Sequence, residues 1–298
     1  MGQPLKGVYV ILPTPFDEQR KIDFGSLKTL VDFELDAGVH GITLLGILGE
    51  VMRLSETEKR EITEAVVNQV KGRVPVVAGT GASGTDLAIM YGKEAEETGV
   101  DAIMAAPPRL LKPNDDSIFN YYRDIAKEVH VPIVIQDEPT TYAVHMSPSL
   151  IARLSTIERV GYVKLEDAPT PLKITTIRDL IEDKLGIFGG LGGLYFYEEL
   201  LRGACGIMTG FAYPEILVRI YESFSKGKRD YSRSLFYSAL PLIRYEAQPL
   251  VSLAIRKEIL RRRGLIKTTV VRDPATKLDS ESLKEINELV QAVEQSTQ

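Results

Sequence analysis

One lysine stands at the end of a short apolar run, a position that suits covalent chemistry with carbonyl compounds. The run 160–163 ends in Lys164, and the carboxylates of Glu166 and Asp167 follow closely. A continuous apolar run of this length is typical of a buried strand. Burial generally lowers the pKa of a lysine ammonium, and a neutral lysine amine forms Schiff bases with carbonyl groups. The alternative is a solvent-exposed lysine paired with one of the two carboxylates.

Lys164, Gln136 and Glu166 are the candidate catalytic residues. Because residues two apart in a strand share a face, Glu166 is expected to point the same way as Lys164 and to carry protons. The alternative role for Glu166 is an ion pair with a loop cation. Gln136 ends an earlier apolar run, and its amide can orient a substrate but cannot titrate near neutral pH. Asp137 is expected to face the opposite side, toward the helices.

Glycine-rich segments after two other apolar runs are candidate substrate-binding sites. A short loop between two glycines follows the run 41–45, and backbone N–H groups in such a loop can face a carboxylate. The same glycines would equally suit a tight turn that needs positive φ. Glu50, which follows this loop, is expected to hold it by hydrogen bonds to backbone. The candidate substrate-binding residues, at the ends of three runs, are Gly46, Ile47, Leu48, Gly49, Gly189, Gly190 and Met208.

The elements that position these residues alternate regularly along the chain. Eight apolar runs, continuous rather than alternating, suit strands of a parallel sheet that is covered on both faces. Helical patterns separate them. Eight strands alternating with helices predict a (β/α)8 TIM barrel, whose active site lies at the C-terminal ends of the strands. The predicted strands are 7–12, 41–45, 75–79, 102–106, 132–136, 160–164, 187–189 and 204–208.

A doubly wound sheet is the competing architecture. It would usually carry a Gly-x-Gly-x-x-Gly turn after an early strand, whereas the first run here ends in Pro13-Thr14-Pro15-Phe16, which cannot cradle a pyrophosphate. No strand pattern follows residue 226, so we predict a catalytic barrel over 1–225 and a small C-terminal helical extension over 226–298. The predicted helices are 26–35, 55–70 with a capping box, 86–98, 116–128, 148–154, 172–183, 230–245, 249–263 and 280–295.

Composition excludes several classes of function. The chain has 298 residues, a net charge of −5 and 44% hydrophobic residues, which suits a soluble protein without a nucleic-acid partner. The single cysteine, Cys205, excludes an internal disulfide and fits a reducing compartment, so we expect a cytoplasmic protein. The three histidines and this cysteine lie too far apart in sequence to suggest a metal site. The apolar run near the N-terminus is too short for a signal peptide or a membrane span.

Several motifs resemble the dihydrodipicolinate synthase/N-acetylneuraminate lyase family, and the match covers nearly the whole chain. The residues that carry this resemblance are Gly7-Val8, Thr14-Pro15-Phe16-Asp17, Ile22-Asp23, Gly46-x-x-Gly49-Glu50, Leu54-Ser55-x-x-Glu58-Lys59-Arg60, Val76-Val77-Ala78-Gly79, Pro107-Pro108 and Lys112-Pro113. Lys164 falls on the family's Schiff-base lysine. The resemblance implies condensation of this lysine with a 2-oxo acid, followed by aldol, retro-aldol or dehydration chemistry without a metal or organic cofactor. It also implies a homo-oligomer, a tetramer or a dimer.

The chain departs from the family's pattern at the positions of its proton relay. Ile47 and Leu48 replace two threonines, and Gln136 begins a Gln-Asp-Glu-Pro segment in place of Tyr-Asn-x-Pro. Leu110 replaces a tyrosine that a neighbouring subunit lends, and Thr141 stands where synthases have an arginine. We therefore predict a lyase, an aldolase or dehydratase of a 2-oxo acid such as pyruvate or a 2-keto-3-deoxy sugar acid. The alternatives are 4-hydroxy-tetrahydrodipicolinate (dihydrodipicolinate) synthase and a non-catalytic barrel that binds a 2-oxo acid as a sensor.

Overall fold

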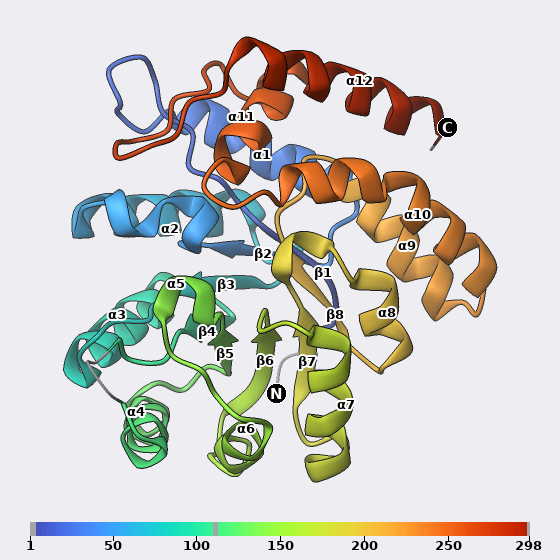
Figure 1. Ribbon diagram of the computed structural model, residues 1–298. Coiled ribbons are helices and arrows are strands. Elements are labelled where there is room, and N and C mark those ends of the chain that lie inside the picture. The colour runs from blue at the N-terminus through green and yellow to red at the C-terminus, as the bar shows by residue number, and fades with distance from the viewer. Residues whose placement is uncertain (1–3, 110–112, 297–298) are drawn as a thin grey trace.

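Eight parallel strands close into a barrel with helices on its outside, which confirms the predicted (β/α)8 fold (Figure 1). The structure, a computed structural model, describes residues 4–109 and 113–296. Each strand pairs with the next along the chain, and β8 closes the ring against β1. The strands are β1 (Gly7–Ile11), β2 (Gly41–Leu44), β3 (Val76–Gly79), β4 (Ala102–Ala105), β5 (Ile133–Asp137), β6 (Val160–Leu165), β7 (Gly186–Gly189) and β8 (Gly206–Thr209).

Helices follow the strands in the expected order, with ends that differ from the predicted ones by a few residues. The sequence does not predict α5, α8 or α9. The first two are only four and six residues long, and α9 buries consecutive apolar residues, which hides its helical spacing. The helices of the barrel are α1 (Phe24–Asp36), α2 (Glu56–Val70), α3 (Thr85–Thr98), α4 (Asp115–Glu128), α5 (Pro139–Tyr142), α6 (Pro148–Leu154), α7 (Thr170–Ile181), α8 (Phe196–Leu201) and α9 (Pro214–Ser225).

The hydrophobic core has two parts, because each strand sends alternate side chains to opposite sides. The larger part fills the layer between the strands and the surrounding helices. The smaller part fills the inside of the barrel, where Tyr9 and Phe188 pack edge to face with ring centroids 5.3 Å apart. This inner cluster also contains Met208, which is fully buried. The inner cluster thus forms a packed floor beneath the C-terminal ends of the strands.

Local signals fix the start of two helices as the sequence predicts. The Ser55 hydroxyl accepts a hydrogen bond from the Glu58 N–H, and the Glu58 carboxylate accepts one from the Ser55 N–H, so a capping box opens α2. Ser147 caps α6 by accepting from the Leu150 N–H at 3.1 Å, and Pro148 occupies the first turn. Residues 50–55 separate α2 from the glycine-containing turn that follows β2, and they include a second 3₁₀ turn, η2 (Val51–Arg53).

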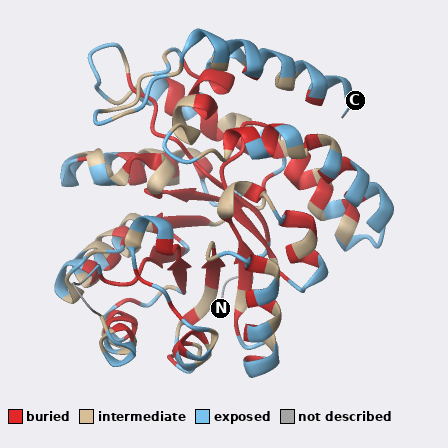
Figure 2. Cartoon of the chain, in the orientation of Figure 1, coloured by how far each residue is buried: buried red, intermediate tan, exposed pale blue. Residues whose placement is uncertain are grey.

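The C-terminal residues form α10 (Arg229–Glu246), α11 (Ser252–Arg262) and α12 (Ser280–Ser296). α10 packs along α9 and α12, and the three helices gather over one side of the barrel (Figure 1). Figure 2 shows buried strands and a largely exposed α12, of which only Ile286 and Val293 are fully buried. Within the described ranges, no helix is both long and apolar enough to cross a bilayer.

Candidate active site

Lys164 lies inside the barrel, near the C-terminal end of β6. Its side chain is 3% exposed, and its Nζ lies 2.6 Å from Oε2 of Glu166. The pair confirms that Lys164 and Glu166 point the same way, as strand alternation predicts. Their angles fall outside those of a hydrogen bond, so Oε2 has a close cation but no hydrogen-bond donor among the described residues. A carboxylate at this distance can accept a proton from the lysine ammonium.

Glu166 is held in place by the turn that follows β7. Its Oε1 accepts a hydrogen bond from the Leu191 N–H at 3.1 Å. Its side chain packs on Gly190, where a Cβ atom would stand 2.4 Å from the Glu166 Cγ. Gly190 therefore has to be glycine for Glu166 to reach Lys164. This packing fixes the Glu166 carboxylate and leaves it in the barrel interior.

Gln136 lies opposite Lys164 on the neighbouring strand, because the two residues are register partners of β5 and β6. It is 3% exposed, and its Nε2 finds no acceptor in the described part of the chain. A buried amide donor without a partner costs about 1–3 kcal/mol. A bound ligand with an acceptor atom would remove that cost. Gln136 is thus suited to orient a substrate that is attached to Lys164.

Asp137 faces away from the barrel interior, as predicted. Its Oδ2 lies 2.6 Å from Nζ of Lys173, a residue of α7. The same ammonium also donates to Oδ2 of Asp167 at 2.8 Å and to the Met146 carbonyl at 2.7 Å. Burial raises the pKa of Asp137 to about 6, although Lys173 opposes the rise. Lys173 was not identified from the sequence, since a single lysine on a helix face carries no local signal of this role.

The turn after β2 is a short 3₁₀ helix, η1 (Ile47–Gly49). Gly46 has φ −80°, and the left-handed conformations fall instead on Leu45 (φ 56°) and Glu50 (φ 59°). Neither Gly46 nor Gly49 has a positive φ, so this turn does not need its glycines for a left-handed conformation. The Gly49 and Glu50 N–H groups close the turn onto the Gly46 and Ile47 carbonyls. The N–H groups of Ile47 and Leu48 have no protein acceptor within the residues described, so they are available to a carboxylate.

Replacing Gly49 by valine is expected to raise the dissociation constant for pyruvate by about tenfold or more, since a distorted turn misplaces these donors. A Cβ at Gly49 would lie 3.3 Å from the Leu12 carbonyl oxygen, so this carbonyl or the turn has to shift by a few tenths of an ångström, and a branched side chain adds to the crowding. The control is Ile47→Val, which keeps the backbone and should change binding less than about twofold. Isothermal titration with pyruvate measures both. Equal effects would place the carboxylate site elsewhere, with Gly190 the next candidate.

The remaining predicted substrate-binding residues lie at the end of β7 and in β8. Gly189 faces outward, since a Cβ there would stand 1.8 Å from Oε2 of Glu199 on α8. Only Gly190 of this pair therefore faces Glu166. Met208 belongs to the inner core cluster. Cys205 lies just before β8 rather than within a strand, and burial raises the pKa of its thiol to about 12.

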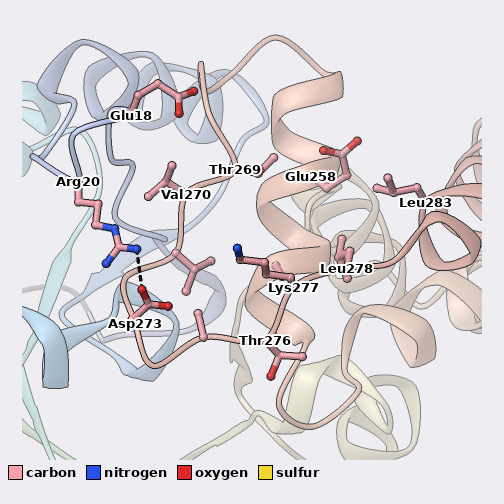
Figure 3. A pocket seen from close by; sticks show the side chains of 13 residues that line it. Glu18, Arg20, Glu258, Thr269, Val270, Asp273, Thr276, Lys277, Leu278 and Leu283 are labelled. Atoms are coloured by element: carbon pink, nitrogen blue, oxygen red, sulfur yellow. Dashed lines mark hydrogen bonds and ion pairs between the residues drawn. The ribbon is translucent and has the colours of Figure 1, made fainter.

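One hollow is lined by the turn after β2, and a second hollow adjoins the first. The first, of about 500 Å³, is lined by Ile47, Leu48 and Arg53 together with the α10–α11 loop and the segment 271–276. The other, of about 490 Å³, is bounded by the segment 269–278, α11 and the loop that carries Arg20 (Figure 3). Both hollows share Val271 in their walls. Among the residues that the structure describes, no three metal-ligand side chains gather, and the absence of a cofactor stays a prediction.

Comparison with known proteins decides the family. A model of the dihydrodipicolinate synthetase family matches residues 4–293. The chain belongs to this family. It is therefore a lyase of the aldolase and dehydratase type. An L-2-keto-3-deoxyarabonate dehydratase of Azospirillum brasilense is 28% identical over 94% of this chain and 92% of its own length.

Synthases of the family are also similar to this chain. A 4-hydroxy-tetrahydrodipicolinate synthase of Syntrophobacter fumaroxidans is 34% identical over 82% of this chain and 84% of its own. The crystal structure of a dihydrodipicolinate synthase from Rhodopseudomonas palustris superposes with a TM-score of 0.91 at 35% identity, with 97% of each chain covered. Leu110, which replaces the tyrosine lent between subunits, lies outside the described residues. Thr141 lies in α5, where its N–H donates to Glu138 at 2.7 Å.

Proposed function

We propose that the protein forms a Schiff base between Lys164 and a 2-oxo acid, and that it cleaves or dehydrates a hydroxylated 2-oxo acid such as a 2-keto-3-deoxy sugar acid. The observation that supports this proposal is the buried Lys164 amine with Glu166 2.6 Å away and the unpartnered Gln136 amide on the neighbouring strand. The similarity to a 2-keto-3-deoxyarabonate dehydratase over nearly the whole chain agrees with this substrate class.

The proposed reaction begins with activation of the lysine. Glu166 takes a proton from the Lys164 ammonium, and the neutral amine adds to C2 of the 2-oxo acid. The resulting carbinolamine loses the C2 oxygen as water and becomes an imine. Glu166 removes a C3 proton to give an enamine and returns that proton to the C4 hydroxyl, which leaves as water. In aldol cleavage the C4 hydroxyl loses its proton instead, the C3–C4 bond breaks, and an aldehyde leaves the enamine of pyruvate.

Each proposed step assigns a role to a residue already in place. Glu166 is the base near C3 and C4. It is the one carboxylate among the described residues that forms an ion pair with Lys164. Gln136 donates its amide to a substrate oxygen but transfers no proton. The free N–H groups of Ile47 and Leu48 bind the carboxylate of the 2-oxo acid. Gly190 and Met208 bound the space around the substrate.

The test is a screen of 2-oxo acids with borohydride as the trapping agent. Pyruvate and several 2-keto-3-deoxy sugar acids are incubated separately with the protein, and intact mass spectrometry follows reduction. One adduct per chain is expected for pyruvate and for the natural substrate. A panel without any adduct would contradict the proposal.

The synthase is the alternative within the same family, and we expect turnover of pyruvate with aspartate semialdehyde to be negligible. By the family resemblance, Gln136, Leu110 and Ile47 replace the three relay groups, and general acid–base assistance is typically worth about 10²–10⁴-fold. A coupled assay for the condensed product measures this activity. Efficient turnover would show that another group replaces the relay and would favour the synthase. The non-catalytic sensor is disfavoured by membership in a family of lyases.

We also propose a homo-oligomer, a tetramer or a dimer, which resides in the cytoplasm. The family resemblance supports the assembly, and the single cysteine supports a reducing compartment. The expected partner is a small-molecule 2-oxo acid, without nucleic acid or membrane. Light scattering of the purified protein measures the assembly state, and a monomer at micromolar concentration would contradict it.

A further inference from the structure

Glu50 connects the turn after β2 to the C-terminal extension. Its carboxylate is fully buried, although the backbone around it belongs to a loop at the barrel mouth. Oε1 accepts a hydrogen bond from Lys257 Nζ of α11 at 2.6 Å. Oε2 accepts one from the Arg272 backbone N–H at 2.9 Å. The expected hydrogen bond to backbone is present, but its donor is the distant Arg272 N–H rather than the loop itself. The other partners of the carboxylate are the side chains of Lys257 and of Arg53, which lies 3.4 Å from Oε2.

Lys257 is equally buried, and Glu50 is the carboxylate that pairs with its ammonium group. Its side chain is 0% exposed, its Nζ donates to the Val270 carbonyl at 2.7 Å, and it lies 4.6 Å from the centroid of the Phe16 ring. Arg272 lies over the same ring at 4.3 Å. The other side of this segment lines the 490 Å³ hollow in Figure 3, where Thr269 and Val270 are drawn. Glu50 and Lys257 therefore hold the segment 269–278 against the barrel, through the Arg272 N–H and the Val270 carbonyl.

Short backbone bonds tie Glu50 to the candidate carboxylate site. The Glu50 N–H donates to the Ile47 carbonyl at 3.0 Å, and the Glu50 carbonyl accepts from the Arg53 N–H at 2.7 Å. The Thr14 hydroxyl donates to the Gly49 carbonyl at 2.7 Å. A shift of Glu50 therefore moves Ile47 and its neighbours, because the turn has only three residues. Their free N–H groups would be displaced from a bound carboxylate.

We propose that Glu50 and Lys257 are a positioning pair, through which the C-terminal extension sets the affinity of the turn after β2 for the substrate carboxylate. The inference rests on the proposed function, because it assumes that this turn binds the substrate carboxylate. Neither residue touches the reacting atoms. Loss of the pair should therefore change the KM for the 2-oxo acid and leave the chemistry on Lys164 nearly intact.

The charge of Lys257 gives the pair a pH dependence. The pKa of Lys257 is lowered to about 8, mainly because burial disfavours the charged ammonium; Glu50 opposes this shift, and the charges of Arg53 and Arg272 contribute to it. Glu58 faces Arg272 on the outer side of this cluster. Below pH 8 the ammonium is charged and pairs with Glu50, and above pH 8 the charge is lost. The KM should therefore rise between pH 7 and pH 9.

The test compares KM and kcat for Lys257→Met, Glu50→Gln and the wild type across this pH range. Both variants should raise the KM at pH 7 by about tenfold or more, since small misplacements of binding groups have large effects. Their KM should also lose its rise between pH 7 and pH 9. The kcat and the extent of borohydride trapping at saturating substrate should stay within about twofold. Lys267→Met, at an exposed lysine two residues before this segment, is the control and should match the wild type.

Unchanged KM in either folded variant would overturn the positioning role. Should Lys257→Met fail to fold, Glu50→Gln and the wild-type pH profile decide the question, because a flat wild-type KM also overturns the proposal. Trapping separates this outcome from failure of the proposed function. A wild type that traps no 2-oxo acid at saturation contradicts the Schiff-base chemistry, whereas trapping with unchanged KM in the variants contradicts only the positioning pair.

Discussion

Replacing Lys164 by methionine is expected to reduce turnover of any substrate by at least about a thousandfold, because the covalent intermediate can no longer form. Methionine is close to lysine in length and fills the same buried space. The wild type, treated with pyruvate and borohydride, should carry one label, and peptide mapping should locate it at Lys164. The variant should carry none.

A suitable control is Lys127→Met, at an exposed lysine of α4. It should keep both turnover and labelling. Labelling of another lysine in the wild type, or equal labelling in Lys164→Met, would exclude the Schiff base at this position. Circular dichroism of the variant distinguishes loss of the nucleophile from loss of the fold.

Changing Glu166 to glutamine is expected to preserve trapping on Lys164 and to reduce turnover by about 10²-fold or more. Glutamine keeps the size of the side chain and can still accept from the Leu191 N–H. It cannot exchange protons with the substrate. Single-turnover measurements should place the loss in the step after imine formation.

The matched control for this change is Asp167→Asn. Asp167 also follows β6, but it pairs with Lys173 outside the barrel interior. Its neutral variant should change turnover by less than about tenfold, because no proton transfer depends on it. Unchanged turnover in Glu166→Gln would leave the substrate carboxylate or a bound water as the proton carrier, and would reduce Glu166 to a structural partner of Lys164.

Much of the barrel could be predicted because its strands are continuous apolar runs. The same regularity predicted that Glu166 would share a face with Lys164 and that Asp137 would turn away, since both follow from alternation along a strand. The end of α6 was also predicted to the residue. α9 was missed because its buried residues cover several faces rather than one stripe.

The contacts that hold the site together could not be read from the sequence. Lys173 bonds to Asp137, which lies 36 positions earlier, and Lys257 bonds to Glu50, which lies 207 positions earlier. Such bonds depend on how whole helices pack, and no local pattern of charge or spacing predicts them. The conformation of the turn after β2 was similarly hidden, because the positive φ angles fall on Leu45 and Glu50 rather than on its glycines.

The bond between Glu50 and Arg272 also has a consequence for synthesis on the ribosome. Their 222 positions of separation correspond to on the order of ten to forty seconds of elongation at typical rates of about 5–20 residues per second. During that interval the nascent barrel already contains the turn after β2 but lacks both of the distant donors to Glu50. The turn can reach its final form only when the last part of the chain has emerged, so activity should appear after release rather than during translation.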